Sequence, residues 1–229
     1  NIQIQDHHLD WPKGKDPRRI FVNSVSDLFL PERFVSDEYL TEIFDVMEEC
    51  DQHVFQALTK HGTEHDQRLL TWDEEHDYWP DNLWMGVTVE QASRKYRIEQ
   101  LKSTDATTKW VSFEPLVGPI DISPEELEGI NWVVIGGESG PDDDRREMDH
   151  AWAREIRNAA KANGLPVFFK QSSSYQPEQE RKLAEEGRNL NEARLLGADT
   201  TPYRELPPLP ESLLEEMPEL QDHIIRPSA

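Results

Sequence analysis

The sequence contains a single cysteine, Cys50, in 229 residues. One thiol excludes an internal disulfide, so the fold needs no oxidising compartment. Cys50 continues the apolar spacing of Tyr39–Met47, which predicts a buried helical position and not a reactive thiol. The chain also lacks any apolar run near the roughly 20 residues that a membrane span requires, and its first residues show no signal-peptide pattern. We therefore expect a soluble, cytoplasmic protein that makes no membrane contact.

Basic residues are scarce relative to acidic ones. Lys and Arg number 24 against 46 Asp and Glu, which gives a net charge of -22 and a pI of about 4.6. Because phosphate contacts need a basic face, this balance argues against nucleic-acid binding. The acidic excess is spread along the chain, and self-repulsion of this size destabilises a compact state unless salt screens it. This predicts a halophilic organism with a high-salt cytoplasm; a merely acidic protein is the alternative.

Six apolar runs each stop at polar or charged residues. Such runs are typical of strands buried on both faces, as in a parallel sheet. The side chains that follow parallel strands meet at one end of a barrel or doubly wound sheet. The sequence therefore predicts an α/β fold, a partial TIM-like barrel of about six parallel strands with one site at its mouth. The runs are Ile20–Asn23, Val54–Leu58, Leu83–Val87, Trp110–Phe113, the run that begins at Trp132, and Val167–Phe169.

The stretch Trp132–Gly140, WVVIGGESG, is the centre of this pattern. Its apolar run ends in Gly136 and Gly137, and glycines let the backbone turn sharply or lie close to a ligand. Glu138 is then placed where a strand ends, within reach of a ligand. The alternative is an ordinary strand-to-loop turn with a solvated glutamate.

Capping residues place the helices. Ser36 predicts the start of a helix that runs to about Cys50, because its hydroxyl can cap the first turn. A second helical segment is predicted over Asp149–Asn163, closed by Gly164 as a C-terminal cap. A third, over Gln91–Ser103, is predicted to turn a basic face towards solvent.

The segment Gly62–Asp81 is predicted to be a long acidic loop, and a loop of that length is usually functional or flexible. His61 and His65 lie four residues apart, a ligand spacing on a helix, but no third ligand is evident and we expect no metal site. The predicted organisation is an extended lead-in over 1–19, a partial barrel over 20–171 and an irregular C-terminal extension over 172–229. The extension contains proline-rich sequence and a charged helix candidate, Gln176–Gly187.

Charged and hydroxyl side chains follow the predicted strands, at the barrel mouth. Carboxylates can take an ammonium group or ribose hydroxyls and lysines can take a carboxylate, so the set suits an amino-acid-like or nucleoside ligand. A glutamate with a raised pKa could equally do acid–base work, or the residues could simply pair with one another. No Walker loop, dinucleotide fingerprint or nucleophile–base spacing accompanies them, so no catalytic residue is assigned. The set comprises Glu90, Glu114, Glu138, Lys60, Lys170, Ser24, Ser26, Thr59 and Thr88.

The strand motifs resemble those of an uncharacterised radical-SAM-like family first described as a phage gene product. They are, in order, FVNSVSDLF, HVFQALTK, NLWMGVTVE, WVSFEPLVGPID, WVVIGGESG and PVFFKQ, from about Arg18 to Gln171, with a weaker match at ADTTPYRELP. The resemblance implies a partial barrel with an N-terminal three-cysteine motif, whose iron–sulfur cluster reductively cleaves S-adenosylmethionine. The positions that it assigns to the small-molecule pocket are Ser24, Ser26, Asp27, Thr59, Lys60, Thr88, Glu90, Glu114, Glu138, Lys170 and Gln171.

The family's cysteine motif is missing, since no cysteine precedes Arg18 and thiolates are the standard ligands of such clusters. The first residue, Asn1, is not a methionine, which favours a truncated chain whose cluster-binding part lies in a separate N-terminal polypeptide. A divergent member without the redox chemistry is the alternative. Two functions follow: the barrel portion of a radical-SAM-like protein of unknown substrate, inactive alone, or a non-catalytic module that binds a nucleotide, S-adenosylmethionine or a protein.

Overall fold

The computed structural model describes residues 9–23, 26–61, 68–76, 78–141, 144–173, 182–183, 188–189 and 206–207. The protein has an α/β fold with six parallel strands, β1 to β6, as predicted. The chain divides into two compact units: Asn1–Val87 with Glu99–Lys109, and Thr88–Ile98 with Trp110–Ala229. Within each unit the strand order follows the chain order. Closure into a TIM-like partial barrel stays a prediction, as do the predicted domain boundaries.

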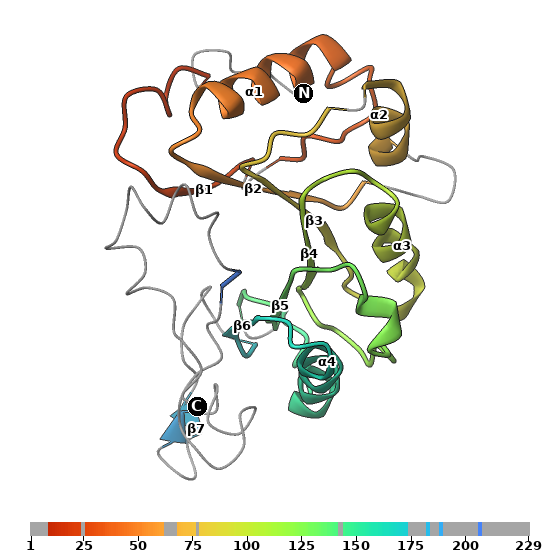
Figure 1. Cartoon of the computed structure of the whole chain (residues 1–229). Helices are drawn as coiled ribbons and strands as arrows, with labels where there is room; N and C mark the ends of the chain where they lie inside the picture. Colours follow the sequence, from red (N-terminus) through yellow and green to blue (C-terminus); the bar gives the residue numbers. More distant parts are fainter. Residues whose placement is uncertain are drawn as a thin grey trace. The chain divides into compact units, whose positions relative to one another are not determined.

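The first unit contains three parallel strands (Figure 1). β1 (Arg19–Phe21) pairs with β2 (Val54–Thr59), which pairs in turn with β3 (Leu83–Thr88). These strands match three of the predicted apolar runs to within one or two residues at each end. Burial along β2 alternates towards its carboxyl end, because successive side chains point to opposite faces of the sheet.

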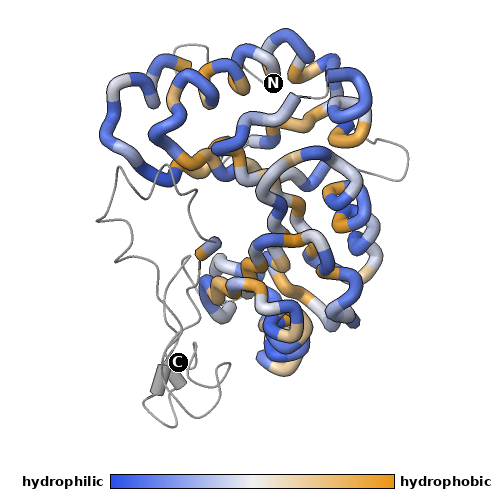
Figure 2. Tube along the Cα trace, in the orientation of Figure 1, coloured by the Kyte–Doolittle hydropathy of each residue, from blue (hydrophilic) through white to orange (hydrophobic). Residues whose placement is uncertain are grey.

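Helix α1 (Asp37–Glu49) begins where its capping residue predicts. The Ser36 hydroxyl accepts a hydrogen bond from the backbone N–H of Tyr39 at 3.3 Å, which satisfies one of the free donors of the first turn. Hydrophobic and hydrophilic residues alternate along the helix, as Figure 2 shows. Its buried face carries Leu40, Ile43, Phe44 and Met47. Cys50, at the end of the helix, is 2% exposed, so its predicted burial is confirmed.

The carboxyl end of α1 is held by a side chain from much later in the chain. Asn82 Nδ2 donates to the carbonyl oxygens of Met47, Cys50 and His53 at 2.8, 3.2 and 3.1 Å. Carbonyls at a helix end lack the donor that the next turn would supply, so a buried amide is a suitable partner for them. Because β3 begins at the next residue, Asn82 couples the end of α1 to the start of β3.

The predicted loop Gly62–Asp81 is wrong over its middle, because α2 (Arg68–His76) lies there. Leu69 and Trp72, three residues apart, are buried, and the Trp72 ring meets the ring of Phe44 on α1 edge-on at 5.2 Å. Two aromatic rings packed in this way stabilise the contact beyond their buried area. Because the segment is mostly acidic, its short apolar spacing did not predict a helix; packing of the apolar residues against the rest of the unit stabilises it.

The second unit contains the other three parallel strands. β4 (Thr108–Phe113) pairs with β5 (Trp132–Gly136), and β5 pairs with β6 (Val167–Gln171). Every residue of β5 is buried, as its apolar sequence predicts. Helix α4 (His150–Ala162) packs against β5 and β6 (Figure 1).

Both ends of α4 are capped, and the predicted C-terminal cap at Gly164 is confirmed. The Asp149 carboxylate accepts from the backbone N–H of Ala151 at 2.8 Å. At the other end Gly164, with φ of +69°, donates to the Lys161 carbonyl, and Leu165 donates to the Ala160 carbonyl. This pair of bonds is the Schellman arrangement, which needs a left-handed residue where Gly164 stands.

The helix predicted over Gln91–Ser103 is divided into a 3-10 turn, η2 (Ala92–Arg94), and α3 (Tyr96–Lys102). The first turn closes through i→i+3 bonds, and Ala92 in this turn is exposed. A further 3-10 turn, η3 (Glu125–Leu127), follows β4.

Most of the predicted C-terminal extension, including most of the helix candidate Gln176–Gly187, lies outside the described residues. Strand β7 (Lys182–Leu183) pairs antiparallel with β8 (Arg188–Asn189), so the predicted helix is wrong at Lys182 and Leu183. Among the residues that the structure describes, no helix is long and apolar enough to cross a membrane.

Candidate functional site

Glu114, Lys170 and Gln171 form a polar cluster at the carboxyl ends of two strands, and we call it the Glu114 cluster. Glu114 directly follows β4, and the other two residues end β6. Lys170 Nζ lies 3.0 and 3.3 Å from the two Glu114 carboxylate oxygens, and Gln171 Nε2 donates to Glu114 Oε1 at 2.9 Å. The Lys170 and Glu114 side chains are 29% and 21% exposed, so the ion pair is partly desolvated and still reaches solvent.

Two glycines at the end of β5 allow this cluster to form. A Cβ added to Gly136 would lie 3.0 Å from Glu114 Cδ, so Gly136 leaves the space that the carboxylate occupies. A Cβ on Gly137 would lie 2.4 Å from the backbone nitrogen of Ser173, which real Cβ atoms essentially never do. Gly137 donates to the Gln171 carbonyl and accepts from Gln171 Nε2, both at 2.9 Å. Gly137 therefore allows the backbone after β5 and the backbone after β6 to approach each other closely.

Glu138 is held by an arginine. Arg146 Nε and Nη2 donate to its two carboxylate oxygens at 3.0 and 2.6 Å, and the Arg146 backbone N–H donates at 2.9 Å. The Arg146 side-chain bonds, followed by its backbone N–H, lower the pKa of Glu138 from 4.5 to about 2. The carboxylate therefore holds the loop after β5 through Arg146, and the role of Glu138 in ligand binding stays a prediction.

Thr88 and Glu90 form a separate group with two arginines. Arg97 Nη1 donates to the Thr88 carbonyl at 2.7 Å and to Glu90 Oε2 at 3.0 Å, and Arg94 Nε lies 3.6 Å from Glu90 Oε1. Arg97 is 6% exposed, so the face predicted to be basic and solvated is partly buried around Glu90. The Thr88 hydroxyl is buried and has no hydrogen-bond partner among the described residues.

In the first unit, Asp27 organises the end of β2. Its carboxylate accepts from the Thr59 hydroxyl at 3.0 Å, the Lys60 backbone N–H at 2.8 Å and the Phe29 backbone N–H at 2.9 Å. Thr59 is fully buried, whereas Lys60 and Ser26 are exposed. Ser24 lies outside the described residues.

The predicted site residues thus fall into local groups. The structure brings Glu114 to Lys170 and Gln171, Thr88 to Glu90, and Asp27 to Thr59 and Lys60. Arg146 and Arg97, the partners of two predicted carboxylates, were not predicted as site residues. The available signal was weak: a basic residue eight residues after Glu138 and another seven residues after Glu90. That residues from both units share one rim stays a prediction.

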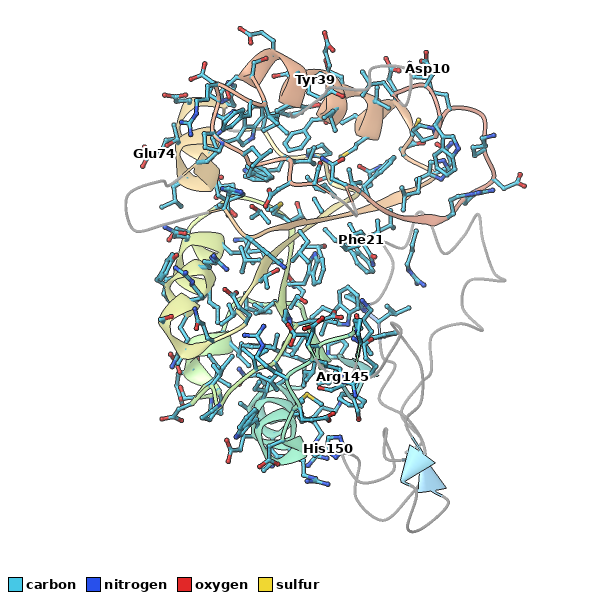
Figure 3. All side chains as sticks on the ribbon, turned by 180° about the vertical axis from the view of Figure 1, so that it is seen from behind. Asp10, Phe21, Tyr39, Glu74, Arg145 and His150 are labelled. Atoms are coloured by element: carbon cyan, nitrogen blue, oxygen red, sulfur yellow. The ribbon has the colours of Figure 1, made fainter. Side chains whose placement is uncertain are left out.

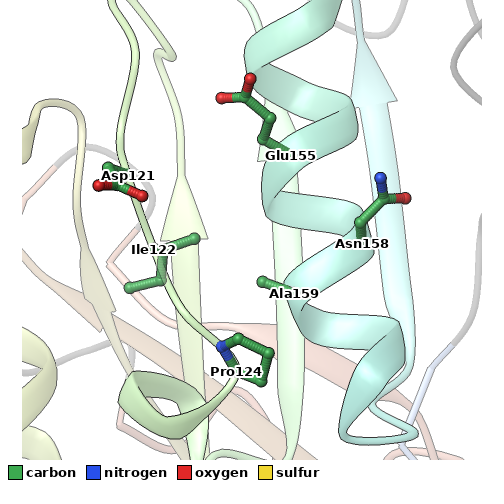
Figure 4. A pocket seen from close by; sticks show the side chains of 6 residues that line it. All are labelled: Asp121, Ile122, Pro124, Glu155, Asn158 and Ala159. Atoms are coloured by element: carbon green, nitrogen blue, oxygen red, sulfur yellow. The ribbon is translucent and has the colours of Figure 1, made fainter.

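An open groove of about 400 Å³ lies between α4 and the segment after β4 (Figure 4). Ile122, Pro124 and Ala159 give it apolar surface, and Asp121 and Glu155 give it carboxylates. Its sixth lining residue, Asn158, already accepts two bonds from Arg157 through its Oδ1. None of the predicted site residues lines this groove.

Comparison with known proteins identifies the family. The sequence matches, over residues 1–198, the family described as "Protein of unknown function (DUF5131)". The chain belongs to this family. No curated protein matches it. Among solved structures, the lead(II) complex of Haloferax volcanii malate synthase is similar at 15% identity and a TM-score of 0.29, over 91% of this chain and 66% of that one. At this TM-score the likeness carries no argument about fold or function.

The residues of this family member do not fit an iron–sulfur cluster. The sequence has one cysteine, and Cys50 is buried at the end of α1, where burial raises the pKa of its thiol. A buried thiol is hard for a cluster to reach, and a raised pKa keeps it protonated, so both properties oppose thiolate ligation. Asp37, Glu75 and His76 also bring ligand atoms within 4.8 Å of one another, but Asp37 already pairs with Arg68. His65, one of the two histidines considered from the sequence, lies outside the described residues.

Proposed function

We propose that this chain is the ligand-binding barrel portion of a radical-SAM-like protein, and that the Glu114 cluster holds the amino-acid end of S-adenosylmethionine. The observation that carries the proposal is the partly exposed Glu114–Lys170 ion pair at the carboxyl ends of β4 and β6. Open parallel sheets bind ligands at those ends.

The charges of the cluster suit a zwitterion. The α-ammonium group of an amino acid would bind Glu114, and its α-carboxylate would bind Lys170 and the amide of Gln171. One ion pair would thus be exchanged for two, so neither protein charge is left desolvated and unpaired on binding. Charge-assisted hydrogen bonds of this kind contribute about 1.5–3 kcal/mol each.

In this proposal the chain binds and orients but does not cleave its ligand. Reductive cleavage requires an electron, which an iron–sulfur cluster supplies when one is present. The buried Cys50 cannot ligate such a cluster alone, so the thiolates would come from residues outside these 229.

A non-catalytic binding module is the second candidate. It is favoured by Glu138, because a carboxylate committed to Arg146 is not available to hold a cofactor without breaking three hydrogen bonds. Such a module would use the same Glu114 cluster for S-adenosylmethionine, a nucleotide or a protein.

Calorimetric titration with S-adenosylmethionine tests the binding site directly. We expect Glu114→Gln and Lys170→Met each to weaken binding about 10- to 100-fold, the equivalent of one lost charge-assisted hydrogen bond. Glu128→Gln, an exposed glutamate in the same unit, is the matched control and should bind as the wild type does. Absence of binding by the wild type at millimolar ligand, or unchanged affinity in Glu114→Gln, would refute the site.

A second experiment separates the two candidate functions. Coexpression with the coding sequence upstream of Asn1 should give brown, iron-containing protein if the radical-SAM-like proposal is correct. Micromolar binding of S-adenosylmethionine by this chain without iron, together with colourless coexpressed protein, would favour the non-catalytic module.

A further inference from the structure

The open groove beside α4 has one wall from this helix and one from the irregular segment 121–124, which follows β4 (Figure 4). Helix α4 begins at His150, which Figure 3 labels. Glu155 and Ala159, four residues apart and therefore on one side of the helix, line the groove. Both walls belong to the second unit, so the groove is a feature of that unit alone.

The groove is apolar towards the end where its walls are tied together. Asn163, at the carboxyl end of α4, donates through Nδ2 to the Pro124 carbonyl. Ile122 and Ala159 are each 7% exposed, so they form an apolar floor between the walls. The volume of about 400 Å³ lies within the size range of small-molecule sites.

The other end of the groove is acidic. Asp121 and Glu155 stand on opposite walls, and both residues are exposed, so a ligand in the groove reaches them from solvent (Figure 4). Lys95, which does not line the groove, donates to the Asp121 backbone carbonyl and pairs with Glu126. Two like charges that face one groove repel each other, and a cation placed between them removes that repulsion.

An acidic end beside an apolar floor suits a linear alkylammonium ion. Its ammonium group has three N–H donors, enough for the carboxylates of both walls. Its hydrocarbon chain leaves water when it lies on Ile122 and Ala159. A metal ion would gain nothing from this floor, which offers no oxygen ligand, and an anion would meet two negative charges.

We propose that this groove binds a linear aliphatic amine, free in solution, with its ammonium group between Asp121 and Glu155 and its chain on the apolar floor. Two features favour a small molecule over a segment of another protein: the tie at Pro124 closes one end, and the volume is that of a small-molecule site. The Glu114 cluster lies outside the groove lining, so this proposal does not rest on the proposed function.

The test measures binding of pentylamine, methylamine and 1-pentanol to the full chain, by nitrogen-15 NMR titration at constant ionic strength. We expect pentylamine to shift the backbone amide signals of Ile122 and Ala159. Methylamine keeps the charge without the chain and should bind at least about 10-fold more weakly, because burial of about two methylene groups corresponds to that ratio. 1-Pentanol keeps the chain without the charge and should also bind at least about 10-fold more weakly, because it loses the charge-assisted hydrogen bonds.

Two variants and a matched control locate the site. Asp121→Asn and Glu155→Gln should each weaken pentylamine binding about 10-fold, the equivalent of one lost charge-assisted hydrogen bond. Glu128→Gln removes an exposed negative charge outside the groove lining and should bind pentylamine as the wild type does. All three side chains are exposed, so we expect the variants to fold, and their urea unfolding midpoints check this.

Equal weakening of pentylamine binding in Glu128→Gln would show a diffuse attraction of cations to an acidic surface, and would overturn the proposal. Absence of pentylamine binding by the wild type, or equal affinity for pentylamine and methylamine, would overturn it too. Binding of S-adenosylmethionine is tested through Glu114 and Lys170 instead, so either site can fail without the other.

Discussion

Replacement of Gly137 by alanine tests the close backbone approach at the end of β5. The added Cβ would lie 2.4 Å from Ser173 N and 2.8 Å from both Ser172 C and Ser173 Oγ. Two of these three atoms belong to the backbone, so the strand ends must separate. Overpacking of this kind destabilises a fold by about 1–3 kcal/mol. Separation also weakens the two 2.9 Å bonds between Gly137 and Gln171, each of which contributes about 0.5–1.5 kcal/mol.

We therefore expect Gly137→Ala to lower the free energy of unfolding by about 3 kcal/mol. With an m value of about 2 kcal/mol per molar urea, the unfolding midpoint should fall by about 1.5 M. Gly118→Ala is the matched control, because a Cβ there meets no atom within 4 Å and its φ is not in the left-handed region. The control should be neutral or more stable by up to about 1 kcal/mol. Equal midpoints for the two variants would refute the argument from close approach.

Three further predictions concern a cap, a titration and the overall charge. Ser36→Ala should destabilise the fold by about 1 kcal/mol in urea titrations because α1 loses its N-cap, whereas Ser26→Ala, at an exposed serine, should have no effect. Arg146 lowers the pKa of Glu138 from 4.5 to about 2, so this carboxylate stabilises the folded state fully above pH 4.5, and that contribution is lost as the pH falls towards 2. Glu138→Gln should therefore flatten the dependence of the free energy of unfolding on pH between 4.5 and 2, and an unchanged dependence would contradict the assignment. With a net charge of -22, the melting temperature should rise by more than about 5 °C from about 0.1 M to about 3 M potassium chloride, and a flat response would remove the halophilic interpretation.

The parts of the fold that local sequence determines were predicted. Ser36 caps α1 and Gly164 closes α4, because each acts on the backbone within a few residues. The pairing of Glu114 with Lys170 was within reach too, since both residues follow buried parallel strands whose ends meet.

Features that depend on distant partners were missed. Helix α2 is stabilised by the packing of Trp72 on Phe44, and the acidic sequence of α2 does not predict that contact. Glu138 pairs with Arg146 because of the path of the loop after β5, which strand patterns do not specify.

Asn82 has a consequence for the order of events in folding. Its amide reaches the carbonyls at the end of α1 from 35 residues away from Met47, so that end of the helix gains its donor only once β3 has docked. Contacts of long sequence separation form after the chain has lost the entropy of closing the intervening loop. The capped first turn of α1 can form early on its own, whereas its last turn is completed together with the sheet.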